Sequence, residues 1–129
     1  TPPRPEIMMN KILSALTLAT ALAATNAHAQ SAPARILGGM LVGSNGMTLY
    51  VFDKDEGGKS ACNGKCAENW PPLAALDGDQ AVGDLSLISR EDGRKQWAWK
   101  GKPVYFWSKD QKPGDTTGDG FNGVWHVAR

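Results

Sequence analysis

The sequence predicts a mainly β fold: a small antiparallel domain built from two related repeats, with long Gly- and Asp-rich loops and little helix. The motif YVFDKD at residues 50–55 returns as YFWSKD at residues 105–110, with Tyr, an aromatic residue, Lys and Asp at matching positions. A tryptophan follows each tyrosine after twenty residues, at Trp70 and Trp125. The apolar runs are short and none keeps a helical period over three turns. A match at an offset of 55 residues indicates two related units packed on each other.

The N-terminal part is expected to lie outside the repeats. Residues 1–7 precede the first methionine and have the character of upstream sequence. Residues 8–29 predict a signal peptide, with a basic residue at Lys11, an apolar run too short to span a bilayer comfortably, and Ala-His-Ala before the cleavage point. We therefore expect residues 30–129 to form a single soluble β domain, periplasmic or secreted. No cysteine stands at the cleavage point, so neither a lipid anchor nor membrane insertion is expected.

Repeat one is expected over about residues 36–73. The apolar runs at residues 36–42 and 47–52 predict two strands, and the Gly-Ser-Asn-Gly stretch between them predicts a hairpin. Alternate residues of the second strand point to opposite faces, so both faces can be covered. A polar loop with both cysteines follows. Within it, residues 66–69 predict one helical turn, which the next two prolines end.

Repeat two is expected over about residues 85–127. Its predicted strands cover residues 85–89, 95–99, 104–107 and 124–127. Tight turns join the first three strands into a meander, and a loop rich in Gly and Asp precedes the last. If an approximate twofold axis relates the repeats, the strands with Tyr50 and Tyr105 are expected beside it.

Composition excludes some partners. Residues 30–129 contain 12 basic and 12 acidic residues, so the exported domain is nearly neutral. No basic patch indicates nucleic acid, and no cationic amphipathic stretch indicates a membrane surface. The sequence names no partner.

The repeated aromatic and acidic residues are predicted to be structural. A tyrosine and the aromatic residue two positions later share one face of a strand, where such pairs bury a large area. An aspartate just past the strand end is placed to accept hydrogen bonds from loop N–H groups. The alternative is a ligand surface of paired aromatic rings, of the kind that binds sugars. The residues are Tyr50, Phe52, Asp55, Trp70, Tyr105, Trp107, Asp110 and Trp125.

Cys62 and Cys66 are predicted to form a disulfide, the usual state of a close pair in an oxidising compartment. Their spacing fits neither a haem-attachment site nor a thioredoxin-type redox pair. A copper site remains as the alternative, because two thiolates and a remote histidine, here His126, bind Cu(I). Alignment of the repeats places the cysteines and the histidine in different units.

Other candidate sites are weaker. Asp110, Asp115, Asp119 and Asn122 crowd one loop, but their spacing is not that of a calcium-binding EF-hand loop, and Asp with Gly is the normal composition of turns. One histidine in the exported part, with no nucleophile motif and no phosphate-binding loop, nominates no catalytic residue. We expect no enzyme activity and no cofactor, with copper as the alternative.

Several motifs in order resemble a known family. They are GMTLYVFDKD at residues 46–55, the cysteine pair, WPPL from Trp70, GKPVY at residues 101–105, and WHV from Trp125. The chain is similar, over about residues 36–127, to the bacterial secreted-repeat or predicted lipoprotein family with the Tyr-x-(Phe/Trp/Tyr)-x-x-Asp motif, whose function is unknown. This resemblance implies export but no activity. The sequence thus predicts a non-enzymatic binding or envelope-associated module, with a periplasmic redox or copper-handling protein as the alternative.

Overall fold

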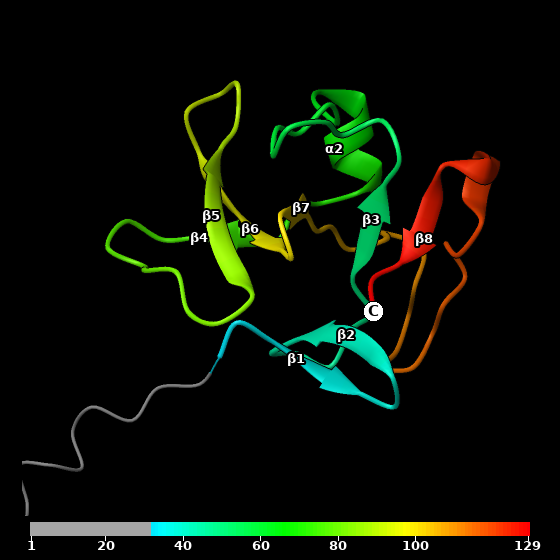
Figure 1. The fold of residues 1–129 in the computed structure, drawn as a ribbon. Coiled ribbons are helices and arrows are strands. Elements are labelled where there is room, and N and C mark those ends of the chain that lie inside the picture. The colour runs from blue at the N-terminus through cyan, green and yellow to red at the C-terminus, as the bar shows by residue number, and fades with distance from the viewer. Residues whose placement is uncertain (1–31) are drawn as a thin grey trace, which may run out of the picture. The chain divides into compact units, whose positions relative to one another are not determined.

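The computed structural model of this chain describes residues 32–129, which form one compact unit (Figure 1). The predictions for residues 1–7 and 8–29, upstream sequence and signal peptide, lie outside the described residues. Within residues 32–129, no helix is long and apolar enough to cross a membrane.

Short strands and two very short helices make up the unit. The strands are β1 (Ala34–Leu37), β2 (Met40–Gly43), β3 (Tyr50–Phe52), β4 (Ala74–Ala75), β5 (Leu85–Ser89), β6 (Lys95–Trp99), β7 (Lys102–Pro103) and β8 (Trp125–Val127). The helices are α2 (Lys65–Asn69) and the 3-10 turn η2 (Phe121–Gly123).

All strand pairings are antiparallel, as the sequence predicts. β1 and β2 form a hairpin, β3 pairs with β8, and β6 lies between β4 and β5 and also pairs with β7. In Figure 1 the hairpin lies at the bottom, the sheet around β6 to the left, and the β3–β8 pair to the right. The fold class is therefore confirmed as mainly β with little helix.

The strand predicted over residues 36–42 is interrupted, and this prediction is corrected. The chain reverses at Gly38 and Gly39, which have φ angles of +61° and +79°, so that Leu37 pairs with Met40. Glycine takes such angles without the steric cost that a Cβ brings. The predicted turn at residues 43–46 also forms. The Gly43 N–H donates to the Met47 carbonyl across it, over 2.9 Å.

The strand predicted over residues 104–107 is also corrected. The regular pairing with β6 ends at β7, and Tyr105 instead forms isolated bridges to Tyr50 and Pro72. The chain leaves the sheet at Tyr105, whose backbone pairs with Tyr50 of the other repeat. The strand predicted over residues 47–52 is regular only in β3, and an isolated bridge joins Thr48 to Val42 before it. The other predicted strands, and the helical turn α2, form close to their expected bounds.

Two clusters of buried side chains form the core, and they lie on opposite sides of the motif strands. Leu49 and Val104 belong to an aliphatic cluster that also contains Trp97. Their sequence neighbours Tyr50 and Tyr105 belong to an aromatic cluster. This alternation is the one that strand geometry imposes on successive residues.

The motif tyrosines pair with each other, as expected if an approximate twofold axis relates the repeats. The Tyr50 N–H donates to the Tyr105 carbonyl over 2.7 Å, and the Tyr105 N–H donates to the Tyr50 carbonyl over 3.0 Å. Both residues are fully buried. The two repeats are thus joined through equivalent atoms of equivalent residues.

Candidate functional site

Each motif tyrosine bonds the aspartate of the other repeat. The Tyr50 hydroxyl donates to Asp110 Oδ2 over 2.7 Å. The Tyr105 hydroxyl donates to Asp55 Oδ2, also over 2.7 Å. The other carboxylate oxygen of each aspartate accepts an N–H from its own loop, over 2.7 Å at Asp55 and 3.0 Å at Asp110. Each aspartate therefore ties its own loop to the motif tyrosine of the opposite repeat.

Burial sets the protonation of these groups. It raises the pKa of both tyrosine hydroxyls well above their ordinary value of 10.0, and the neighbouring aspartates raise it further. Both hydroxyls therefore stay protonated and act as donors. Burial also raises the pKa of Asp55 above 3.8, although the Ala61 N–H, the Tyr105 hydroxyl and the Arg90 charge oppose that rise.

The remaining motif rings form one continuous stack. Trp70 and Trp125 lie at its centre, with ring centroids 3.8 Å apart and planes 3° apart. Phe52 stacks on Trp125 at 4.1 Å, and Trp107 stacks on Trp70 at 4.0 Å. The 55-residue offset maps Trp70 onto Trp125 and Phe52 onto Trp107, so the stack is symmetric about its centre.

The eight motif residues are thus brought together, and most are interior. Trp70 and Trp125 are each 3% exposed and Trp107 is 8% exposed. Rings this deep do not offer the open aromatic surface of the sugar-binding alternative. Their arrangement supports the structural interpretation.

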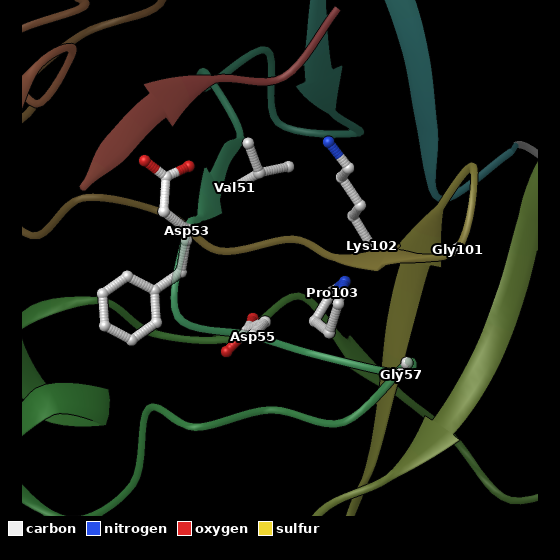
Figure 2. Close-up of a pocket in the computed structure, with 9 residues that line it drawn as sticks. Val51, Asp53, Asp55, Gly57, Gly101, Lys102 and Pro103 are labelled. Carbon is white, nitrogen blue, oxygen red and sulfur yellow. The ribbon is translucent and has the colours of Figure 1, made fainter.

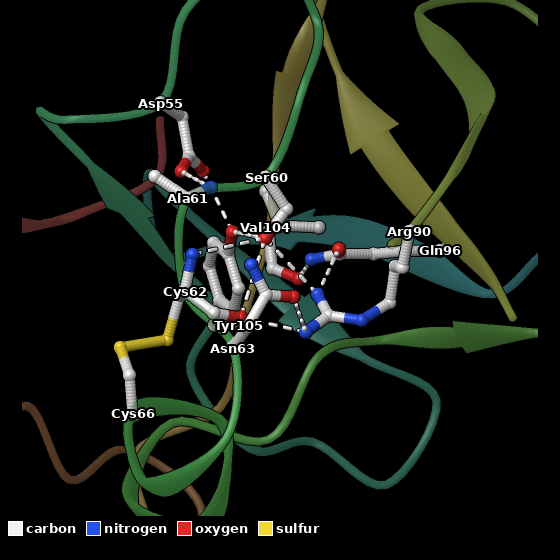
Figure 3. The surroundings of a disulfide bond; sticks show 10 residues. All are labelled: Asp55, Ser60, Ala61, Cys62, Asn63, Cys66, Arg90, Gln96, Val104 and Tyr105. Atoms are coloured by element: carbon white, nitrogen blue, oxygen red, sulfur yellow. Dashed lines mark hydrogen bonds between the residues drawn. A yellow bond between two sulfur atoms is a disulfide. The ribbon is translucent and has the colours of Figure 1, made fainter. Parts of the chain in front are cut away.

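Cys62 and Cys66 are joined in a disulfide that spans the start of helix α2 (Figure 3). Cys62 is fully buried within the aromatic cluster. Its carbonyl accepts a hydrogen bond from Arg90 over 2.6 Å. The disulfide loop is therefore stabilised by a hydrogen bond from buried Arg90 as well as by its own covalent link.

Arg90 is a structural residue that the sequence does not reveal. It is 6% exposed and also donates to Ser60 Oγ over 3.1 Å and to Gln96 Oε1 over 2.7 Å (Figure 3). Its position before the acidic turn Glu91-Asp92-Gly93 is typical of a solvated arginine, so no local signal indicates burial. Through these bonds Arg90 anchors the disulfide loop to the sheet around β6.

The copper alternative has no assembled site in this structure. Both sulfur atoms are in the disulfide, and His126 Nε2 lies 2.8 Å from Asp53 Oδ2 on the β3–β8 pair. Among residues 32–129, no group of three or more His, Cys, Asp or Glu side chains could hold a metal ion. The copper prediction therefore stays a prediction about the reduced protein.

The acidic loop of repeat two has structural bonds. Asp115 accepts the N–H of Gln111 and pairs with Lys112 over 2.8 Å. Asp119 Oδ1 accepts the Val127 N–H over 3.0 Å. With Asp110 bonded to Tyr50, three of the four candidate calcium ligands are engaged in hydrogen bonds within the protein.

One pocket lies beside the motif of repeat one, between β3 and the β6–β7 turn (Figure 2). We call it the lysine pocket; its volume is about 250 Å³. Lys102 stands on one wall, and Asp53 and Asp55 come from the chain after β3. Three glycines complete the lining, and they have no atom within 4 Å of the place where a Cβ would be: Gly57, Gly58 and Gly101.

A second pocket lies at the equivalent place in repeat two. We call it the threonine pocket; its volume is about 190 Å³. The 55-residue offset relates six residue pairs in the two linings: Val51 and Phe106, Phe52 and Trp107, Asp53 and Ser108, Asp55 and Asp110, Lys102 and Met47, and Pro103 and Thr48. Each pocket therefore combines the motif of one repeat with the turn before the motif of the other.

The fold and these sites define a class of protein, a duplicated β domain whose repeats exchange tyrosine–aspartate contacts and frame two equivalent pockets. Residues 32–74 and 86–129 match a family described as a secreted repeat of unknown function, once for each repeat. The chain belongs to this family, which confirms the resemblance seen in its motifs. Neither the curated proteins nor the solved structures include a match.

Proposed function

We propose that this secreted repeat protein is a non-enzymatic binding module, and that its lysine pocket takes a small zwitterion such as a free amino acid or short peptide. The observation that carries the proposal is the occurrence of one pocket at the motifs of both repeats. A concave pocket with a few converging charged or polar groups is the usual form of a small-molecule site.

The charges of the lysine pocket favour a ligand that carries both signs. Lys102 is exposed, and among residues 32–129 no carboxylate lies within 4.0 Å of its ammonium group. Asp55, which also lines the pocket, is half-buried, and burial raises its pKa. A ligand carboxylate would pair with Lys102, while a ligand ammonium would offset the unfavourable burial of the Asp55 charge.

The glycines of the lysine pocket favour a ligand with a peptide-like backbone. Gly57 and Gly58 have φ angles of +59° and +73°, and their backbone is not covered by side chains of their own. They form the two-residue turn between the bridged residues Glu56 and Lys59, and a side chain at either position would stand in space that is empty in this structure. Close approach of a ligand backbone is a further use of glycine, and it is the one proposed for this pocket.

Titration with glycylglycine, followed by NMR amide shifts, tests the proposal. We expect shifts at Lys102, Asp55 and the pocket glycines, and none with succinate or ethylenediamine, which carry charges of one sign. Lys102→Met should abolish the shifts, since methionine is the residue at the equivalent position of the other pocket. The exposed lysine variant Lys109→Met is the matched control and should bind normally. Equal binding by all three molecules would contradict the proposal, and cleavage of the dipeptide would contradict a non-enzymatic role.

We further propose a periplasmic or extracellular location for residues 30–129, after removal of the segment before them. The family's description as secreted supports export. Intact mass measurement of the exported protein tests this directly. A start at Gln30 without added lipid is expected, and an acylated or uncleaved product would contradict it.

The copper alternative requires the reduced cysteine pair. Titration of the reduced protein with Cu(I), against a chelator of known affinity, distinguishes it from the binding module. Binding that disappears in a Cys62→Ser, Cys66→Ser variant would favour copper handling. We expect equal, weak binding in both proteins.

A further inference from the structure

Arg90 is a buried cation whose hydrogen-bond partners are all neutral (Figure 3). Its two terminal nitrogens donate to oxygen atoms of four residues: Ser60, Cys62, Asn63 and Gln96. The Arg90 charge opposes the rise in the pKa of Asp55, but among residues 32–129 no carboxylate lies within 4.0 Å of the guanidinium. Buried charges are normally paired with an opposite charge, because an unpaired charge is costly to remove from water. Arg90 therefore lacks the anion that usually accompanies a buried arginine.

One donor of Arg90 remains unused, and it is accessible. A guanidinium has five N–H donors, and the Nε–H of Arg90 donates to no atom of residues 32–129. In that part of the chain, the Thr48 hydroxyl is the only enclosed side-chain group without a hydrogen-bond partner. The Arg90 Nε–H is therefore not enclosed, and a molecule outside the fold can reach it.

Arg90 lines a pocket between helix α2, the segment before β4 and the β5–β6 turn. We call it the arginine pocket; its volume is about 350 Å³. Arg94 and Lys95 belong to the same lining and are exposed, and neither has a carboxylate of residues 32–129 within 4.0 Å. Three cations without ion pairs thus border one pocket. Such a cluster attracts an anion.

The rest of the lining restricts the kind of anion. Glu68 and Asp92 also line the pocket, so its three basic and two acidic side chains leave one net positive charge. This balance suits an anion with a single charge, because a second negative charge would be repelled by the two carboxylates. Ala67, Pro71 and Pro72 contribute apolar surface, against which a hydrocarbon group can pack. The lining therefore fits an organic monocarboxylate better than an inorganic dianion.

We propose that the arginine pocket binds a small organic carboxylate, which accepts a hydrogen bond from the Arg90 Nε–H and pairs with the charges of Arg94 and Lys95. The hydrocarbon part of the ligand packs on the two prolines. This site goes beyond the proposed function, because it is a different pocket and takes a ligand of one charge. The 55-residue offset makes Arg35 the equivalent of Arg90, and Arg35 is exposed, so the buried cation is a feature of repeat two.

Titration of the whole protein with sodium benzoate, followed by NMR, tests the proposal, and neutral benzamide is the matched ligand. We expect benzoate to shift the side-chain Nε–H signal of Arg90 and the backbone amide signals of Arg94 and Lys95. Benzamide should bind about tenfold more weakly or not at all, since an ionised acceptor forms the stronger hydrogen bond. Equal affinity for the two ligands, or an unmoved Arg90 signal, would overturn the proposal. Inorganic phosphate that binds as tightly as benzoate would overturn the preference for an organic monocarboxylate.

Substitutions of exposed residues test the charges without removing buried contacts. The double variant Arg94→Gln, Lys95→Gln should bind benzoate about tenfold more weakly, because it loses both exposed positive charges of the pocket. The double variant Lys54→Gln, Lys109→Gln is the matched control, since it loses the same charge from exposed lysines outside the pocket and should bind normally. Equal binding by the two double variants would overturn the assignment.

The acidic side of the pocket gives a test of opposite sign. Glu68 is exposed, and Glu68→Gln removes a negative charge from the lining. We expect benzoate to bind this variant about threefold more tightly. Weaker binding would contradict the proposed placing of the carboxylate.

The proposals for the two pockets can fail separately. Lys102→Met should leave benzoate binding unchanged while it removes dipeptide binding. Loss of benzoate binding in Lys102→Met would overturn the assignment of benzoate to the arginine pocket. Failure of glycylglycine to bind, with benzoate binding intact, would refute the proposed function alone.

Discussion

The two repeats hold the same contact by different local means. In both, a buried tyrosine of one repeat bonds an aspartate of the other. Behind Asp55 the loop is closed by the Cys62–Cys66 disulfide, whereas behind Asp110 it is closed by Thr117, which stands at the position equivalent to Cys62. The Thr117 hydroxyl donates to Asp110 over 2.6 Å. A covalent link and a hydrogen bond therefore fill the same place in the duplication.

The two pockets also combine shared features with different ones: their inner residues recur in both repeats, and the residues at their rims differ. The aspartate and the aromatic position recur in both linings, but Lys102 and Asp53 make one rim charged, while Met47 and Ser108 make the other neutral. Core positions are constrained by close packing, and rim positions contact mainly solvent or ligand. The duplication thus keeps one scaffold and gives its two pockets rims of different charge.

Removal of a central tryptophan should have the largest effect on stability. Trp70→Ala takes out the ring that stacks on Trp107 and Trp125 and meets Tyr50 edge-on, so we expect a loss of about 3–5 kcal/mol in the free energy of unfolding. Trp125→Ala should cost a similar amount. Urea denaturation measures both. The half-buried Trp99→Ala is the control and should cost less; an equal loss there would contradict a symmetric stack as the main support.

Loss of the disulfide should have the second-largest effect on the free energy of unfolding. It should also distinguish repeat one, which has the disulfide, from repeat two, which does not. For a loop this short the chain-entropy model gives about 2 kcal/mol, which a Cys62→Ser, Cys66→Ser variant should lose in urea denaturation. The loss should be matched by adding a reductant to the unmodified protein. Thr117→Val, the equivalent change in repeat two, should cost less, about 1 kcal/mol, because it removes a single hydrogen bond. A larger loss in Thr117→Val would reverse the comparison.

Much of this comparison can be predicted from the sequence. The repeated motif predicts two related β units, the twofold arrangement of Tyr50 and Tyr105, and an aspartate that accepts loop N–H groups. Strand alternation predicts two buried faces, and both are filled. These features depend on local spacing, which a single sequence contains.

The crossed contacts could not be predicted in the same way. An offset of 55 residues makes Tyr50 equivalent to Tyr105, but it does not tell whether each bonds its own aspartate or that of the other repeat. The pockets could not be predicted for the same reason, since each is formed by segments about fifty residues apart in the sequence. Arg90 is missed for a different reason: burial of an arginine depends on partners such as Gln96 that only the folded chain brings together.

The two motif aspartates should differ when each is made neutral. Asp110→Asn replaces an acceptor of three hydrogen bonds by a group with its own donors, so we expect a loss of about 1–3 kcal/mol. Asp55→Asn should cost less, because burial already disfavours the charge there. Thermal or urea unfolding at pH 7 compares them. A larger loss in Asp55→Asn would show that the charge at Asp55 is favourable.

The pH dependence of the free energy of unfolding tests the interpretation of Asp55, because the raised pKa predicts the direction of the change. Because the pKa of Asp55 is raised above 3.8 in the folded protein, the folded state binds this proton more tightly than the unfolded state. Its contribution to stability is then present below pH 3.8 and lost as the pH rises through the folded pKa. Asp55→Asn should therefore gain stability relative to the unmodified protein as the pH rises through that window. A relative loss would contradict the raised pKa.

The smallest effect on stability is expected at the pocket rim, where the two repeats have different residues that do not pack in the core. His126 and Asp53 are paired over 2.8 Å, but their side chains are 45% and 52% exposed. Solvent screens such pairs, so His126→Asn should change the free energy of unfolding by no more than about 0.5 kcal/mol. The equivalent of Asp53 is Ser108, which carries no charge, so repeat two already lacks an ion pair at this position. A loss above about 1 kcal/mol would place this pair among the contacts that hold the repeats together, and the division between shared core and variable rim would not hold.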